Sequence, residues 1–261
     1  MRIVSLCPSN TEILAYLGLM DYVVGIDNDS DWPEKVEHLP RVGRDLDIDI
    51  DKVLSLKPDL VLASLSVPGM EKNIEKLEQT ELNYITLDPN SLDEIAEDLL
   101  TVGRYTGFET QAERVYQEYY ETLRQYEELA KQITEPKRIY WEWWPKPIFT
   151  PGALNWLSYI SELAGAVNVF SDVNQASVQT EWNEVMKRNP DEICMVWVGV
   201  QEKKMNPDIV RKREDSQKVT AIQQNKIHVL EEYLYCRPSP RLLEGLQKLA
   251  YTLHPNLFPK I

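Results

Sequence analysis

Cysteine, histidine and glycine are all scarce in this chain of 261 residues, with three, three and ten copies respectively. Cys7, Cys194 and Cys236 lie far apart and form no CxxC pair, which excludes a zinc or redox site of that type. The histidines show no HxxxH or HExxH spacing, and no glycine-rich loop that could cradle phosphate is present. We therefore expect no enzyme, no bound metal and no catalytic cofactor.

Basic residues are also in short supply. The chain has 28 basic and 42 acidic residues and a formal net charge of −14. A nucleic-acid-binding protein normally carries a basic face, so no nucleic acid is expected as a partner, and binding to anionic lipid is disfavoured. The surplus of carboxylates serves either solubility or an acidic surface that meets a basic partner.

Long apolar runs are missing as well. No stretch approaches the roughly 20 apolar residues of a membrane span. Residues 1–8 show no basic start followed by an apolar stretch and a cleavage site, so no signal peptide is visible. We expect a cytoplasmic protein if Met1 is the native start, and a periplasmic or cell-surface protein if an export segment was removed.

Short apolar runs alternate with helical patterns in both halves of the chain. Strands are predicted at residues 2–6, 22–26, 60–63, 83–87, 138–143, 192–198 and 227–230. Helical patterns follow most of these runs, and residues 239–253 form a closing helix. Alternation of strand and helix predicts parallel sheets with helices packed on their faces.

One segment, residues 109–133, departs from this alternation. It contains neither glycine nor proline, and its apolar residues recur at helical spacing. A helix of about 25 residues spans about 37 Å, enough to connect two lobes. The expected fold is therefore α/β, with two Rossmann-like lobes joined by one long rigid helix. We place the N-terminal lobe at 1–106, the connecting helix at 107–135 and the C-terminal lobe at 136–261.

Four phrases are similar to signatures of one protein family. They are RIVSLCPSNTEIL at 2–14, VGR at 42–44 with IDKVLSLKPDLVL at 50–62, WNEV at 182–185 with NPDEI at 189–193, and RPSPRLLEGL at 237–246. In this order and spacing they resemble the class III, helical-backbone periplasmic binding proteins that carry cobalamin, haem and ferric siderophores. Among these, the chain looks most like the cobalamin-binding proteins of ABC transporters. The resemblance runs from the first strand to the last helix.

The resemblance implies a ligand held in a cleft between the two lobes and only limited hinge motion. It also implies delivery to an ABC transporter, with one acidic residue of each lobe meeting arginines of the permease. Glu71, just after Pro68 and Gly69, is where the first of these acids is expected. The second acid is left unassigned. We expect a monomer whose ligand is a corrinoid or another metal chelate, with cobalamin as cargo and not as a cofactor.

Tryptophans are the densest feature of the second lobe. Three indoles fall within residues 141–144, and a strand alternates its faces, so they cannot all be core residues. Flat aromatic surfaces suit a corrin or porphyrin-like ligand, because they bury much area at low entropy cost. Trp143, Trp144 and Trp156 are therefore candidate ligand contacts, and core packing is the alternative for each.

Polar residues follow the strands of the first lobe. In α/β sheets, ligand sites lie outside the carboxyl ends of the strands. Asp31 and Trp32 follow the second predicted strand and are therefore candidate ligand contacts. Ser9 and Asn10 follow the first strand, and Ser64 and Ser66 follow the third, and they offer hydroxyl and amide groups to the amide arms of a corrin. Ordinary turn and capping chemistry is the alternative. The acidic stretch at 27–31 lacks the glycine and distal glutamate of a calcium loop.

Arginines and tyrosines near predicted turns complete the candidate set. Arg44 and Arg237 can each bind a carboxylate or phosphate through two parallel hydrogen bonds, and surface ion pairs are the alternative. Tyr233 and Tyr235 either face the cleft or pack.

The leading hypothesis is a substrate-binding protein that captures a corrinoid for uptake by an ABC transporter. A ferric-siderophore or haem binder is the first alternative. A cytoplasmic corrinoid-handling enzyme or regulatory protein on the same scaffold is the second. Cys7 at a helix start is either a nucleophile with a lowered pKa or, the favoured interpretation, a small buried residue.

Overall fold

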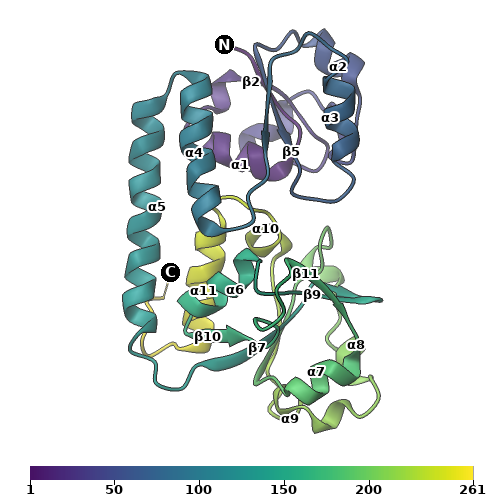
Figure 1. Cartoon of the computed structure of the whole chain (residues 1–261), viewed down its shortest axis with the longest axis vertical. Coiled ribbons are helices and arrows are strands. Elements are labelled where there is room, and N and C mark those ends of the chain that lie inside the picture. Colours follow the sequence, from purple (N-terminus) through teal and green to yellow (C-terminus); the bar gives the residue numbers. More distant parts are fainter. Residues whose placement is uncertain (261) are drawn as a thin grey trace. The chain divides into compact units, whose positions relative to one another are not determined.

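The computed structural model describes residues 1–260, and the chain divides into two compact units. The first unit comprises Met1–Tyr120 and Pro238–Pro240, and the second comprises Glu121–Arg237 and the chain from Arg241 onward. Within the first unit, the hydroxyl of Ser239 donates to the buried carboxylate of Glu12. Each unit contains a parallel sheet with helices around it, so the predicted two-lobed α/β fold is confirmed (Figure 1).

The first unit is built on a four-stranded parallel sheet in the order β2-β1-β5-β6. Its strands are β1 (Ile3–Ser5), β2 (Val23–Ile26), β5 (Leu60–Ser64) and β6 (Tyr84–Leu87). Every residue of β1 and β5 is buried, as expected for the central strands of a sheet covered on both faces. The carboxyl ends of these strands therefore meet at one edge.

Helices and one small hairpin surround this sheet. They are α1 (Pro8–Tyr16), α2 (Ile50–Ser55), α3 (Glu71–Leu77), α4 (Leu92–Thr106), two 3-10 turns (Met20–Tyr22 and Glu34–His38) and the hairpin of β3 (Gly43–Arg44) and β4 (Asp47–Ile48). Ser91 and Glu94 form a complete capping box at the start of α4, which ends at Gly107 with φ +75°.

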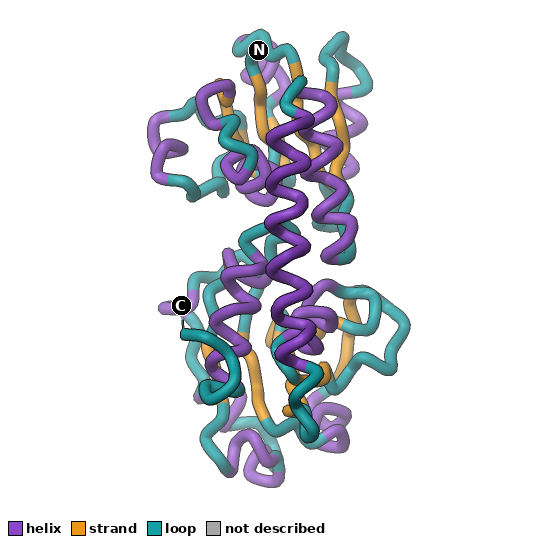
Figure 2. The backbone as a smooth tube through the Cα atoms, turned by 90° about the vertical axis from the view of Figure 1, so that its left-hand side faces the viewer, coloured by secondary structure: helices purple, strands orange, loops and turns teal. Residues whose placement is uncertain are grey.

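The long helix α5 (Glu109–Ala130) is unbroken, as predicted, and ends three residues before the predicted limit (Figure 2). It begins in the first unit and ends in the second. Its start packs tightly on α4, because a β-carbon at Gly103 would lie 2.3 Å from that of Ala112. Farther along, the ring of Tyr126 stacks on Phe258, with 5.4 Å between centroids.

The second unit has its own four-stranded parallel sheet, in the order β10-β7-β12-β13. Its strands are β7 (Lys137–Glu142), β10 (Ala166–Asn168), β12 (Glu192–Met195) and β13 (Ile227–Val229). The helical elements are α6 (Trp156–Leu163), α7 (Trp182–Arg188), α8 (Asp208–Arg211), α9 (Thr220–Gln223), α10 (Glu232–Tyr235), α11 (Leu242–Leu253) and 3-10 turns at Glu202–Lys204 and Ser216–Lys218. β12 ends three residues earlier than predicted, because the chain turns away after Met195.

A small antiparallel sheet of the second unit was not predicted. It consists of β8 (Trp144–Pro145), β9 (Ile148–Pro151) and β11 (Ser177–Thr180), in the order β11-β9-β8. The six residues of β8 and β9 include Pro145 and Pro151. Proline usually interrupts strand pairing, so the sequence did not indicate a strand here. In the described part of the chain, no helix combines the length and apolarity needed to cross a membrane.

Candidate functional site

The carboxyl ends of β1 and β5 in the first unit meet in a group of hydroxyls around a thiol. The hydroxyl of Ser64 donates to that of Ser66 at 2.8 Å. The sulfur of Cys7 lies 3.3 Å from the Ser9 hydroxyl and 4.0 Å from that of Ser66. The structure therefore brings the three predicted serines together. Burial, helped by the charge of Asp27, raises the pKa of the Cys7 thiol to about 11, so it stays protonated at neutral pH and is a poor nucleophile.

Asn10 has a structural role. Its side chain is 1% exposed and its amide donates to the carbonyl oxygen of Ala63 at 2.9 Å. This bond fastens α1 to β5. The amide is therefore buried and already used by the fold, and ligand contact at Asn10 stays a prediction.

The loop after β2 carries Asp31 and Trp32. Its interior is organised by Asp27, which is fully buried and accepts hydrogen bonds from the backbone N–H groups of Asp29 at 2.7 Å and Ser30 at 2.8 Å. Burial raises the pKa of the Asp27 carboxyl to about 6. Trp32 is half-buried with its ring 5.8 Å from that of Tyr16.

Asp31, in the same loop, is exposed. The Asp27 carboxylate is used by the loop's own N–H groups, so it is not arranged as in a calcium loop. Among residues 1–260, no group of three or more histidine, cysteine or acidic side chains is placed to hold a metal ion.

Arg44 and Glu71 lie on the surface of the first unit. Arg44 is exposed in the β3–β4 hairpin. Glu71 begins α3, and its carboxylate accepts the N–H of Gly69 at 2.7 Å. Together with burial and the charge of Glu94, the charge of Glu71 raises the pKa of Asp88, which indicates that these carboxylates are neighbours. Ligand contact by Arg44 and partner docking by Glu71 stay predictions.

In the second unit, the tryptophans at the end of β7 have different environments. Trp141 is fully buried and its indole N–H donates to Ser161 at 2.9 Å. Trp143 is half-buried, with its ring 5.7 Å from that of Trp156. Trp144 is 40% exposed and its indole N–H donates to the carbonyl of Lys146. The prediction that these three indoles are not all core residues is confirmed.

Trp156 and Tyr235 are core residues. The indole N–H of Trp156 donates to the carbonyl of Tyr235 at 2.8 Å, and the side chain is 6% exposed. Tyr235 has no exposed surface, and its hydroxyl donates to the carbonyl of Gly245 at 2.8 Å. The polar groups of both residues hold α6, α10 and α11 together, which is the core-packing alternative, and ligand contact by either stays a prediction.

Tyr233 and Arg237 flank this core and are half-buried. The guanidinium of Arg241 lies over the Tyr233 ring, 4.6 Å from its centroid. Arg237 forms an ion pair with the carboxylate of Glu232 at 3.3 Å, and both side chains are largely buried, so it is not the surface pair given as the alternative. Ligand contact by Tyr233, Arg237 and the remaining candidates stays a prediction.

An ion pair that the sequence did not indicate lies at the end of β7. Glu142 is fully buried, and its carboxylate accepts from Arg213 at 2.5 Å, from the Tyr140 hydroxyl at 3.2 Å and from the indole N–H of Trp197 at 3.3 Å. The Arg213 guanidinium also lies 5.0 Å from the ring centroid of Trp182. The pair ties the carboxyl end of β7 to the long segment between β12 and β13. Its partners are 71 residues apart, so no local pattern marks it.

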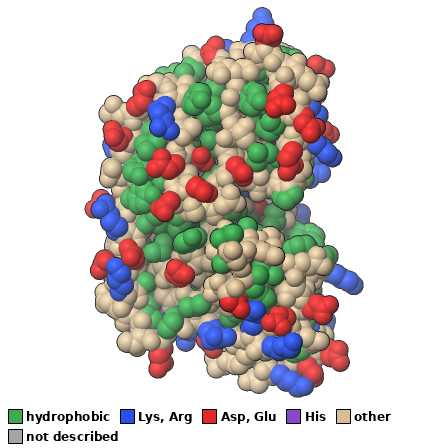
Figure 3. Space-filling view, in the orientation of Figure 1, with side chains coloured by type: hydrophobic (Ala, Val, Ile, Leu, Met, Phe, Trp, Pro, Cys, Tyr) green, Lys and Arg blue, Asp and Glu red, His purple; other side chains and the backbone are tan. Residues whose placement is uncertain are grey.

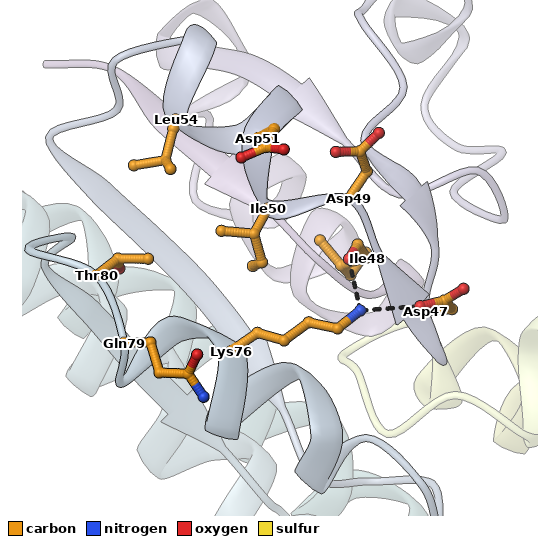
Figure 4. Close-up of a pocket in the computed structure, with 9 residues that line it drawn as sticks. All are labelled: Asp47, Ile48, Asp49, Ile50, Asp51, Leu54, Lys76, Gln79 and Thr80. Atoms are coloured by element: carbon orange, nitrogen blue, oxygen red, sulfur yellow. Dashed lines mark hydrogen bonds and ion pairs between the residues drawn. The ribbon is translucent and has the colours of Figure 1, made fainter.

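A polar depression on the first unit contains none of the predicted residues (Figure 4). It has a volume of about 610 Å3 and is lined by residues of β4, α2 and the end of α3. Its most constrained side chain is Lys76, whose ammonium group donates to the Asp47 carboxylate and the Ile48 carbonyl. No aromatic ring lines it, so the depression does not suit a flat macrocycle.

A family model described as "Periplasmic binding protein" matches residues 3–234. The chain belongs to the periplasmic binding protein family. The predicted family is thereby confirmed, and the matched range contains the second and third of the four sequence phrases and nearly all of the first. Relatives of this periplasmic binding protein include an ABC transporter substrate-binding lipoprotein and vitamin B12-binding proteins.

Two relatives extend over nearly the whole chain. An uncharacterised ABC transporter substrate-binding lipoprotein of Bacillus subtilis is 33% identical over 98% of this chain and 81% of its own length. A vitamin B12-binding protein of Vibrio cholerae is 27% identical over 95% of this chain and 87% of its own length.

Solved structures agree with the fold of this periplasmic binding protein. The periplasmic vitamin B12-binding protein of Vibrio cholerae has a TM-score of 0.79 at 25% identity, covering 97% of this chain and 96% of its own. A possible iron-binding, periplasmic solute-binding protein of Staphylococcus epidermidis has a TM-score of 0.83 at 26% identity, with 97% and 98% covered. A haem-binding protein of Roseiflexus, with a TM-score of 0.85 at 22% identity and 97% and 98% covered, supports the fold alone.

Proposed function

We propose that this periplasmic binding protein captures a corrinoid of the cobalamin type for uptake by an ABC transporter. The observation that carries the proposal is the indole surface at the carboxyl end of each sheet, Trp32 in the first unit and Trp143 with Trp144 in the second. The similarity to vitamin B12-binding proteins over 95% of the chain supports it.

The chemistry of these strand ends favours a corrinoid. A corrin is a broad ring edged with amide arms. Aromatic side chains bury much of such a ring with little loss of rotamer entropy, because each has only two side-chain torsions. Among the hydroxyls around Cys7 in the first unit, Ser66 is partly exposed and could bond an amide arm, whereas Ser9 and Ser64 are buried behind it at 2% and 5% exposure.

Haem is a weaker candidate than a corrinoid for this chain. Cyanocobalamin carries both axial ligands of its cobalt, whereas haem iron commonly takes an axial histidine from the protein. His228 is engaged with Glu192 at 2.7 Å, and His254 with the carbonyl of Gly165 at 3.0 Å. Both rings therefore have structural partners, and the third histidine, His38, is exposed on the first unit. A ferric siderophore stays the alternative that the Staphylococcus epidermidis neighbour suggests.

Titration calorimetry with cyanocobalamin, haemin and a ferric hydroxamate tests the proposal. We expect saturable binding of cyanocobalamin, quenched tryptophan fluorescence and release of the ligand chemically unchanged. No heat and no quenching with cyanocobalamin would overturn the corrinoid assignment, and preferred binding of one of the other two chelates would replace it.

Substitution of an exposed indole sharpens the same titration. Trp144→Ala should weaken cyanocobalamin binding about tenfold, which corresponds to about 1.4 kcal/mol, because a ring at a ligand face contributes on this scale. Tyr105→Ala is the matched control, since Tyr105 is 55% exposed on α4. Equal affinities for the two variants would remove Trp144 from the site.

Docking on a permease is proposed through Glu71. The similarity to an ABC transporter substrate-binding lipoprotein supports a permease partner, and Glu71 is exposed at the start of α3. Glu71→Ala should leave ligand affinity unchanged and lower uptake in cells that depend on this protein. The control is Glu75→Ala, an exposed acid one turn farther along the same helix. Equal uptake with both variants would argue against Glu71.

A further inference from the structure

The loop after β2 is held by a single arginine side chain. Arg41 donates through Nη1 to the carbonyl oxygens of Asp27 at 2.9 Å and Ser30 at 2.6 Å, and through Nη2 to that of Val36 at 3.2 Å. Three carbonyls along ten residues of loop therefore converge on one guanidinium. A planar group with five fixed N–H donors suits this task, and a lysine could not reach all three.

The backbone around Arg41 is itself fixed against the sheet. Arg41 forms a parallel bridge with Ile26, the last residue of β2, and Val42 donates to the Ile26 carbonyl at 2.9 Å. The backbone of Arg41 is therefore fixed against β2, the strand that precedes the loop. Less conformational entropy is then lost when the Arg41 side chain forms its hydrogen bonds.

Asp27 is the second residue that fixes this loop, and we call Arg41 and Asp27 together the frame of the loop. Its carboxylate accepts the N–H groups of Asp29 and Ser30 and the Ser30 hydroxyl. Its own N–H donates to the carbonyl of Ser5 at 3.0 Å. Arg41 thus satisfies loop acceptors while Asp27 satisfies loop donors, and a loop whose polar backbone groups are met internally is more ordered than one solvated by water.

Buried hydroxyls connect this frame to α1. The Thr11 hydroxyl lies 2.8 Å from that of Ser30 and donates to that of Ser5 at 2.8 Å, and all three residues are buried. α1 also carries Tyr16, against which the Trp32 ring packs. The same network therefore fixes the loop, the helix and the two aromatic rings relative to one another.

We infer that Arg41 and Asp27 are positioning residues that hold the Trp32 loop in its ligand-binding conformation before ligand arrives. The inference rests on the proposed function, because it assigns Trp32 to the ligand face. Ordering a loop or a side chain on binding costs affinity, so a frame that orders it in advance preserves affinity. Neither residue is among the candidate site residues predicted from the sequence.

Hydrogen exchange and titration together test this role. In the free protein, Arg41→Met should speed exchange of the amides of residues 28–36 and leave β1 and β5 unchanged. It should also weaken cyanocobalamin binding about tenfold, the scale of losing one to two ordered side chains. Arg41→Lys should fall between wild type and Arg41→Met. Asp27→Asn, nearly isosteric, serves as the second variant if Arg41→Met fails to fold.

The matched control is Arg104→Met. Arg104 is an exposed arginine on α4 that donates to Thr101 of its own helix, so its removal should change neither measurement. If the amides of residues 28–36 still exchange slowly in Arg41→Met and Asp27→Asn, these two residues do not order the loop, and the inference is wrong. Faster exchange with unchanged affinity would overturn the positioning role alone. Wild-type protein that binds none of the three chelates would overturn the proposed function, and the positioning role with it.

Discussion

The two units of this protein differ sharply in charge. The first unit contains 24 acidic and 10 basic residues, which accounts for the whole net charge of −14, whereas the second contains 18 of each. On the face shown in Figure 3, acidic side chains spread over the first unit, and both signs mix around α7 to α9 of the second. Solubility alone requires no such segregation. The long-range field of the protein is therefore a property of its first unit.

The two units also stabilise a buried acid at a strand end in different ways. In the first, Asp27 accepts only neutral N–H and hydroxyl groups, and Arg41 binds nearby carbonyls instead. In the second, Glu142 is paired directly with Arg213. Burial without a cation raises the pKa of an acid towards neutral pH, so its charge changes in that range. A buried ion pair instead loses much of its stability when either partner is removed. The first unit should therefore respond to pH and the second to mutation.

The largest effect is expected from breaking the Glu142–Arg213 ion pair of the second unit. Arg213→Met leaves Glu142 buried without its cation, which should lower the free energy of unfolding by about 3–5 kcal/mol. Urea unfolding followed by circular dichroism measures this loss. Arg213→Met with Glu142→Gln should recover much of it, because the amide removes the uncompensated charge. A loss below about 1 kcal/mol would show that the pair is effectively solvated.

A smaller effect is expected from pH in the first unit. Burial and the neighbouring carboxylates Glu94 and Asp88 raise the pKa of Asp98 to about 7, and one of its oxygens has no hydrogen-bond partner among the described residues. The folded state therefore holds this proton more tightly than the unfolded state. The resulting stability is complete below about pH 4 and is lost as the pH rises through 7.

Asp98→Asn removes this titration. At pH 8 the variant should be about 1–2 kcal/mol more stable than wild type, a figure reduced for the partial exposure of the side chain, and the advantage should shrink towards pH 5. Thermal unfolding across this range measures it. The control is Asp93→Asn, an exposed acid on the same helix. A difference between Asp98→Asn and wild type that does not vary with pH would contradict the assignment.

The smallest expected effects compare one helix cap in each unit. Ser91 caps α4 through a bond to the N–H of Glu94 at 3.2 Å, and the buried Asn155 caps α6 through a bond to that of Leu157 at 2.9 Å. Removing a cap costs about 0.5–2 kcal/mol. Asn155→Ala should approach the upper figure and Ser91→Ala the lower one, because water can replace a lost bond only at the partly exposed site. Equal losses in urea unfolding would contradict this ranking.

Much of the fold was predictable because it depends on local patterns. Short apolar runs such as residues 2–6 and 60–63 became buried parallel strands, and the segment free of glycine and proline became α5. The antiparallel sheet around β9 escaped notice because its strands are short and contain prolines. Its pairing with β11 depends on residues about 30 positions away.

The candidate site was only partly predictable. Trp144 and Trp156 belong to the same aromatic cluster in sequence, yet one ring is 40% exposed and the other 6%. Their difference follows from α10 and α11, which bury Trp156 and Tyr235 and come much later in the chain. The roles of Arg41 and Arg213 could not be foreseen either, since a charged residue in a loop shows no sign of the carbonyls or the carboxylate it will meet.

By itself, the sequence determined the family, the alternation of strands and helices, the long helix and the absence of common catalytic motifs, because these depend on the order of residue types along the chain. Only the tertiary structure decided which aromatic rings stay accessible, which acids are buried and which arginines hold them. Burial and hydrogen bonding depend on neighbours brought together from distant segments, and no local pattern records those neighbours.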